Sequence, residues 1–134
     1  MDREQNLSRF LQNDGKTVIL PIDHGTAIPV PGLEDPSHLI ESLNPFVDAY
    51  VVNLGIARSA AEVLSGKGIC LRTDSYKPPY AENLDEGSYR LYVADEARTV
   101  GAHGMMNMLY LHHANESGIT REAAELIAES LETD

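Results

Sequence analysis

The sequence predicts an α/β fold in which a parallel sheet alternates with helices. Apolar runs rich in β-branched residues alternate with segments whose apolar residues recur at helical spacing, and Gly- or Pro-containing turns separate them. Continuous apolar runs are typical of parallel strands that are buried on both faces. The 134 residues suit one domain, so we predict a leading helix and four βα units within residues 1–134.

Turn and cap residues set the expected boundaries of these elements. Asn13-Asp14-Gly15 ends the leading helix, Asp35 followed by Pro36 is a typical helix start, and Gly66 and Gly101 are typical helix stops. The expected elements are a helix over 2–12, a strand over 17–22, a loop over 23–35, a helix over Pro36–Leu43, a strand over 48–54, a helix over 57–64, a strand over 68–73, a loop over 74–86, a helix over 88–100, a strand over 103–111 and a last helix capped by Thr120, with Leu126, Ile127 and Leu131 on one face.

Periodicity leaves two ways to arrange four parallel strands. They form either an open doubly wound sheet or half of a (β/α)8 barrel, which needs about 250 residues when complete. Strand order distinguishes the two, because a barrel half keeps its strands in chain order. In both arrangements the chemistry gathers where the strands end, at the carboxyl edge of the sheet.

The charge balance excludes several classes of protein. With 21 acidic and 10 basic residues the formal net charge is -11, which repels nucleic-acid phosphates, so we expect no nucleic-acid partner. No apolar run approaches the roughly 20 residues of a membrane-spanning helix. The N-terminus has no apolar signal core, so we expect a cytoplasmic protein with no membrane partner. The single Cys70 suits a reducing compartment, and we interpret it as a buried small side chain rather than a nucleophile.

Polar residues end the expected strands, and each allows a functional and a structural interpretation. Asp23 is a general base or substrate ligand, or it caps a turn, and His24 is a substrate contact or a solvated loop residue. Tyr110 donates a proton to a developing alkoxide or carbinolamine, or its ring packs with the hydroxyl at the rim. Arg72 and Asp74 bind an anionic substrate or pair with each other.

The sequence lacks the patterns of metal and nucleotide sites. His112, His113 and Glu116, with His24, are candidate metal ligands, but their spacing is not the helical His-Glu-x-x-His pattern. Adjacent residues of an extended segment also point to opposite faces. Without a Gly-rich nucleotide loop or a serine-hydrolase motif, we expect neither a metal nor a cofactor.

The lysines offer little for covalent catalysis. A Schiff base needs an amine that is desolvated in an apolar pocket. Lys16 and Lys67 precede expected strands, at the end of the sheet away from the candidate site, and Lys77 lies in a polar, Pro-rich loop. None of these side chains is a convincing Schiff-base lysine.

Several motifs resemble archaeal-type class I fructose-bisphosphate aldolases and the related heptulosonate synthases and autoinducer-2 phosphate thiolase. The most specific is Asp23-His24-Gly25 directly after an apolar strand, and the likeness covers nearly all of the chain in order. The matching segments are Lys16–Gly25, Pro31–Asp35, Asp48-Ala49, Gly55–Arg58, Val100–Ala102, and Tyr110 with Glu116, which have the spacing of a Tyr-x-Gly-Ser-x-x-Glu motif.

The resemblance implies a TIM barrel that cleaves or forms a phosphorylated ketose, such as fructose 1,6-bisphosphate, through a lysine Schiff base. Asp23 matches the active-site Asp of strand one and Tyr110 the catalytic Tyr of strand four, while Glu116, His24 and Arg72 are expected to bind substrate. The family's Gly-Ser after the Tyr is His112-His113 here. The family's Schiff-base lysine lies on strand six and its phosphate loops follow strands seven and eight, beyond the four βα units expected here.

Three interpretations follow. The first is an aldolase-family half-barrel, a fragment or one part of a split gene, whose other half supplies the nucleophile. The second is a non-catalytic half-barrel that covers its open edges by self-association or with a partner. The third is an open-sheet binding domain, flavodoxin-like in outline, with an acidic pocket at Asp23 and Asp74. We favour the first for family and chemistry, and expect a homo-oligomer or a complementing C-terminal half as partner.

Overall fold

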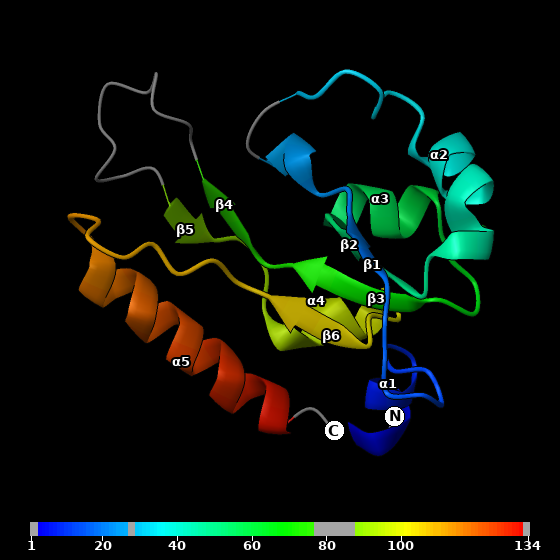
Figure 1. Cartoon of the computed structure of the whole chain (residues 1–134). Helices are drawn as coiled ribbons and strands as arrows, with labels where there is room; N and C mark the ends of the chain where they lie inside the picture. The colour runs from blue at the N-terminus through cyan, green and yellow to red at the C-terminus, as the bar shows by residue number, and fades with distance from the viewer. Residues whose placement is uncertain (1–2, 27–28, 77–87, 133–134) are drawn as a thin grey trace.

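A sheet of four parallel strands forms the centre of the molecule. The computed structural model describes residues 3–26, 29–76 and 88–132. The sheet has the order β1-β2-β3-β6 (Figure 1). Its strands are β1 (Ile19–Pro21), β2 (Ala49–Val52), β3 (Gly68–Arg72) and β6 (Gly104–Met106). Chain order across the sheet confirms a half-barrel and contradicts the open doubly wound alternative, whose first strand would lie inside the sheet.

Helices alternate with the strands, and side-chain caps set the starts of α2 and α3. These are α1 (Arg3–Ser8), α2 (Pro36–Leu43), α3 (Leu54–Ser59), α4 (Ala94–Thr99) and α5 (Glu116–Glu132), with short 3-10 turns η1 (His24–Thr26) and η2 (Asn44–Phe46). Asp35 accepts the His38 amide at 3.1 Å, and α2 begins where it was predicted. Asn53 accepts the Ile56 amide at 2.9 Å, so α3 begins earlier than the expected residue 57.

The main core lies between one face of the sheet and the helices. Tyr50, Val52 and Leu71 from this face are fully buried, together with Ile40 of α2 and Leu64 after α3. The Tyr50 hydroxyl donates to Oδ1 of Asn44 at 3.0 Å, which satisfies the polar group inside the core. Burial raises the pKa of Tyr50.

The opposite face of the sheet carries Cys70 and Arg72, because side chains alternate along β3. At the amino edge of the sheet, the segment after α1 packs closely against this region. A Cβ on Gly68 would lie 2.6 Å from the Arg9 carbonyl oxygen, and one on Gly104 would lie 3.3 Å from the Phe10 ring. Glycine is therefore required at Gly68 for the leading segment to approach the backbone.

The segment from residue 74 to residue 100 differs from the prediction. The expected loop and helix instead contain an antiparallel pair, β4 (Asp74–Tyr76) and β5 (Ser88–Arg90), and α4 begins only at Ala94. In this segment every second residue is a large apolar side chain: Tyr89, Leu91 and Val93. This spacing is typical of a strand, whereas we predicted a helix here. Most of the expected loop between the two strands lies outside the described residues.

Other boundaries and burial patterns also differ. The strand expected to be buried on both faces is an exposed edge strand, with Ile19 43% exposed, because among the described residues no further strand pairs with its outer side. The leading helix ends at Ser8 rather than at residue 12, and β6 is shorter than expected. Helix α5 starts before Thr120, and it buries Leu126 while Ile127 and Leu131 stay exposed. Among the described residues, no helix is both long and apolar enough to cross a bilayer.

Candidate functional site

A buried ion triad lies at the carboxyl edge of the sheet. Asp23 follows β1, Arg72 ends β3 and Asp74 begins β4. The Arg72 guanidinium donates through Nη1 to Oδ2 of Asp23 at 2.7 Å, and through Nε and Nη2 to the two oxygens of Asp74 at 2.5 and 3.2 Å. Asp74 therefore holds the guanidinium at two points, while Asp23 is held at one.

The triad is almost closed to solvent. Asp23, Arg72 and Asp74 are 4%, 8% and 1% exposed. Burial opposes the charge on Arg72, but the hydrogen bonds and charges of Asp74 and Asp23 outweigh it, and the pKa of Arg72 is raised. One guanidinium faces two carboxylates, so pairing is the interpretation of Arg72 and Asp74 that the structure shows.

Backbone contacts tie the triad to the segment that follows β6. The Met108 amide donates to Oδ1 of Asp74 at 3.3 Å, two residues before Tyr110. Thr73, fully buried between Arg72 and Asp74, donates its amide and its hydroxyl to the Met106 carbonyl, each at 2.9 Å. The triad and the Tyr110 segment are thus parts of one edge.

The other predicted site residues lie in the turns beyond this triad. His24 is exposed at the start of η1, directly after Asp23. Tyr110 is half-buried beside His113, with ring centroids 6.2 Å apart. Glu116 is exposed and accepts the His112 amide at 2.6 Å. The structure thus joins Asp23 and Arg72 directly, and links Glu116 to the turn after Tyr110.

His112 carries the backbone signature of a glycine. Its φ is +61°, in the left-handed region that a side chain disfavours. The resemblance places the first residue of the family's Gly-Ser pair at this position. The local turn is therefore built with glycine-like backbone geometry, although the residue has a side chain.

Asp74 was predicted to pair with Arg72 or to belong to an acidic pocket with Asp23, and the structure shows it as the carboxylate that holds Arg72 at two points. Residues two apart on an extended segment share a face, and this spacing was the available signal. Cys70, two residues before Arg72, also shares that face. Burial and then the Asp23 charge raise the pKa of the Cys70 thiol to about 11, which suits the predicted inert side chain.

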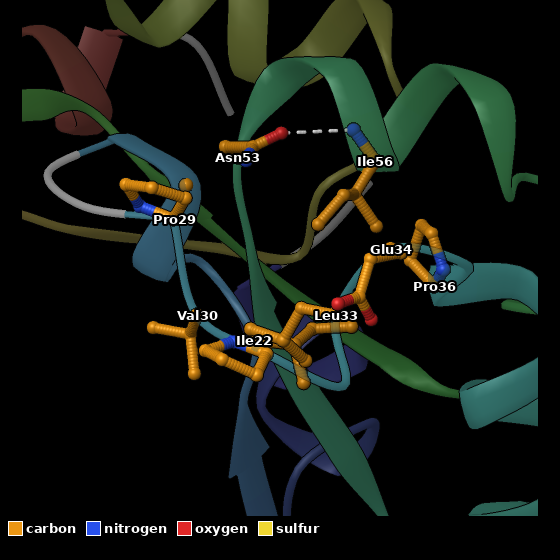
Figure 2. Close-up of a pocket in the computed structure, with 10 residues that line it drawn as sticks. Ile22, Pro29, Val30, Leu33, Glu34, Pro36, Asn53 and Ile56 are labelled. Carbon is orange, nitrogen blue, oxygen red and sulfur yellow. Dashed lines mark hydrogen bonds between the residues drawn. The ribbon is translucent and has the colours of Figure 1, made fainter.

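A cavity of about 530 Å³ lies between the loop after β1 and the first turns of α2 and α3. Figure 2 shows its mostly apolar lining, with Asn53 at the start of α3 and Glu34 just before α2. Asp23, His24, Arg72, Tyr110 and Glu116 are absent from the described lining. A phosphorylated sugar needs cations and hydrogen-bond donors, so we do not place the candidate chemistry in this cavity.

The described lysines are not positioned for a Schiff base at the triad. The Lys67 ammonium donates to the carbonyls of Asn44 and Val47, at 2.6 and 2.7 Å, near the amino edge of the sheet. Lys16 is exposed before β1, and Lys77 lies outside the described residues. Within residues 3–26, 29–76 and 88–132, no three His, Cys, Asp or Glu side chains are grouped as metal ligands would be.

Comparisons with known proteins agree with this architecture. No family model matches the chain. Over 61 residues, 46% of this chain and 23% of the relative, it is 36% identical to 2-amino-3,7-dideoxy-D-threo-hept-6-ulosonate synthase 1 of Archaeoglobus fulgidus.

Solved aldolases have the same fold. An archaeal fructose 1,6-bisphosphate aldolase superposes with a TM-score of 0.81 at 21% identity, covering 98% of this chain and 53% of that one. A Schiff-base-forming fructose-1,6-bisphosphate aldolase gives the same score and identity, with 54% of its chain covered. The chain thus spans about half the length of these structures, while the 61 residues that match the synthase cover 23% of it. The chain is therefore similar in sequence to part of a heptulosonate synthase, and in fold to about half of the TIM barrel of archaeal fructose-1,6-bisphosphate aldolases.

Proposed function

We propose that this chain is the strand-one-to-four half of an aldolase-like lyase, which acts on a phosphorylated ketose such as fructose 1,6-bisphosphate. The observation that carries the proposal is Asp23. It is buried at the carboxyl edge of the sheet with Oδ2 bound to Arg72, while Oδ1 accepts no hydrogen bond from the described residues. One oxygen is therefore positioned and the other is available for proton transfer.

In this proposal Asp23 and Tyr110 move protons. Cleavage of a ketose removes the proton of the hydroxyl next to the scissile bond, and the bond's electron pair passes to an iminium formed with a lysine. Asp23 is the base or acid in these transfers, and Tyr110 exchanges a proton with the carbinolamine or alkoxide. Arg72, clamped by Asp74, positions Asp23. The two carboxylates already facing Arg72 disfavour a substrate phosphate there.

In this proposal the remaining predicted residues, His24 and Glu116, take no part in proton transfer. His24, exposed beside Asp23, is placed to contact substrate above the sheet edge. Glu116 holds the turn after Tyr110 through the His112 amide, and through this turn it shapes the substrate-facing loop. We infer a cytoplasmic enzyme of carbohydrate metabolism, in line with the reduced Cys70.

The nucleophilic amine must come from outside the described residues. Lys67 is engaged by two carbonyls near the amino edge, and Lys16 lies before β1. We infer that this chain alone forms no Schiff base, and that a second half-barrel supplies the lysine and the phosphate-binding loops.

The surface that a second half would cover is visible at both sides of the open sheet. Val18, just before β1, and Ile19, its first residue, are exposed, and so are Leu109 and Leu111 after β6. Ile127 and Leu131, one helical turn apart on α5, are 63% and 64% exposed. Exposed strand edges and apolar residues of this kind are typical of an interface.

These edges also favour a second candidate function, a non-catalytic half-barrel that associates with itself. Two copies related by a two-fold axis would pair β6 of each with β1 of the other, in parallel, which leaves no open edge. Light scattering decides between the states of the isolated chain. A dimer supports this candidate, whereas a clean monomer that binds little hydrophobic dye argues against any exposed interface.

Borohydride trapping tests the catalytic proposal. The chain is incubated with fructose 1,6-bisphosphate and borohydride, alone and after co-expression with the strand-five-to-eight half of an archaeal aldolase. We expect an adduct only in the complex, on the added half. Asp23→Asn should lower the trapping rate about 10²- to 10⁴-fold, while Asp95→Asn, at an exposed carboxylate of α4, should not.

Two results would overturn the proposal. An adduct on the isolated chain would place the nucleophile within it. A stable complex that turns over equally well with Asp23→Asn would remove Asp23 from the chemistry. Slower alkylation of Cys70 in the mixed complex reports assembly independently of catalysis, because Cys70 shares the Arg72 face of the sheet.

A further inference from the structure

A second cavity, of about 210 Å³, lies at the opposite, amino edge of the sheet. The ends of α3 and α4 border it, together with the residues that lead into β3 and β6. Its polar side chains are Arg9, Ser65, Lys67 and His103, and no carboxylate is among the described residues that line it. This lining is unusual in a chain whose net charge is -11.

The polar side chains present donors. The Ile69 amide donates to Nδ1 of His103 at 3.1 Å, which assigns the proton of the neutral ring to Nε2 and makes that atom a donor. Two carbonyls accept from the Lys67 ammonium, which leaves a third N–H. Within the described part of the chain, the Arg9 guanidinium is in no ion pair.

The charges act on one another inside the cavity. Burial and then the positive charge of Arg9 lower the pKa of His103, whose ring also meets Phe10 edge-on. The carbonyl ends of α3 and α4 oppose an anion here, but each carries only about half a charge. Two full positive charges, on Arg9 and Lys67, outweigh them.

We propose that this cavity binds a small oxyanion of the phosphate class, with Arg9 as its principal ligand and Ser65, Lys67 and His103 as further donors. The volume suits an inorganic anion or a phosphoryl group rather than a whole sugar, since pockets for larger ligands start at roughly 300 Å³. The site lies at the end of the sheet away from the triad, and it does not depend on the proposed lyase activity.

NMR titration of the histidines in the full chain tests this site. Inorganic phosphate and glycerol 3-phosphate are compared with chloride at equal ionic strength. We expect phosphate to raise the pKa of His103 and leave the other four histidines unchanged, because the anion offsets the Arg9 charge. A matching response to glycerol 3-phosphate would extend the ligand to phosphate monoesters.

Two arginines near the N-terminus provide the variant and its control. Arg9→Gln should raise the pKa of His103 without phosphate and weaken phosphate binding at least about 10-fold, the loss expected for one charged hydrogen-bonding partner. Arg3→Gln, at an exposed residue of α1 outside the cavity, should change neither quantity.

Several outcomes would overturn the proposal. These are a chloride effect as large as that of phosphate, equal losses in Arg9→Gln and Arg3→Gln, or unaltered binding by Arg9→Gln. If Arg9→Gln fails to fold, Arg9→Lys and Ser65→Ala replace it. Both keep the fold's contacts with the Arg9 backbone, and each should weaken phosphate binding about threefold or more, whereas wild-type affinity in both would contradict the site.

Discussion

The two ends of the sheet handle buried charge in opposite ways. At the carboxyl edge, one guanidinium is enclosed by two carboxylates, and all three groups are nearly fully buried. At the amino edge, the Lys67 ammonium donates to two backbone carbonyls and keeps its charge, and Arg9 is exposed. The carboxyl edge therefore depends on side-chain ion pairs, whereas the amino edge depends on main-chain dipoles and keeps cationic donors available.

Their turns differ as well. The turns at the amino edge take positive φ at Gly66 and Gly101, where it is free of strain, whereas the turn beyond β6 takes it at His112. Backbone strain is thus found on the side of the molecule that holds the candidate active site, as is common for functional sites.

The largest expected effect is at the triad. Arg72→Gln leaves Asp23 and Asp74 buried without their cation, and we expect a loss of about 3–5 kcal/mol in the free energy of unfolding, measured by urea denaturation. Arg98→Gln breaks an exposed pair with Asp95 and should cost about 0–1 kcal/mol. Equal losses of unfolding free energy in the two variants would show that the buried triad stabilises the fold no more than the exposed Arg98–Asp95 pair.

Removing the lysine at the amino edge should have the next largest effect. Lys67→Met leaves the Asn44 and Val47 carbonyls without their shared donor, so we expect a loss of about 1–3 kcal/mol in the same measurement. Lys16→Met, at an exposed position before β1, is the matched control and should be close to neutral. A neutral Lys67→Met would mean that water replaces the ammonium, and that the amino edge needs no cation.

The strained turn offers a smaller gain. His112→Gly relieves the positive φ, and we expect a stabilisation of about 0.5–1 kcal/mol, seen as a higher denaturation midpoint. His113→Gly should instead destabilise, since Nδ1 of His113 accepts the Asn115 amide at 3.0 Å. A loss of stability in His112→Gly would show that the His112 side chain compensates for its backbone.

The smallest expected effect is the pH dependence of the amino edge. The pKa of His103 is lowered in the folded state from 6.5, so the unfolded chain binds the proton more readily. The neutral His103 side chain therefore contributes stability above pH 6.5, and this contribution is lost as the pH falls through the lower pKa of the folded state. His103→Gln should flatten the pH dependence of the unfolding free energy between pH 7 and pH 5, whereas the control His38→Gln, on α2, should not. An unchanged slope would assign the pH dependence to other groups.

Local sequence signals predicted the elements that depend on local chemistry. The Asp35-Pro36 cap placed α2 at its observed bounds, and the apolar runs located all four parallel strands. Local signals failed where partners decide the structure. The period-2 pattern of residues 88–93 could not by itself show that β5 would pair with β4, and the apolar run of β1 could not show that this strand lies at an edge.

For the candidate site, the sequence by itself determined which residues end the strands: Asp23, Arg72 and Asp74 all follow from the strand–loop pattern. It could not choose between pairing and anion binding for Arg72, because that choice depends on Asp23, which lies 49 residues away in the chain. The tertiary structure shows the pairing, because it brings the ends of β1 and β3 together and one guanidinium meets two carboxylates there. These groups are buried away from water, where an unpaired charge would be costly.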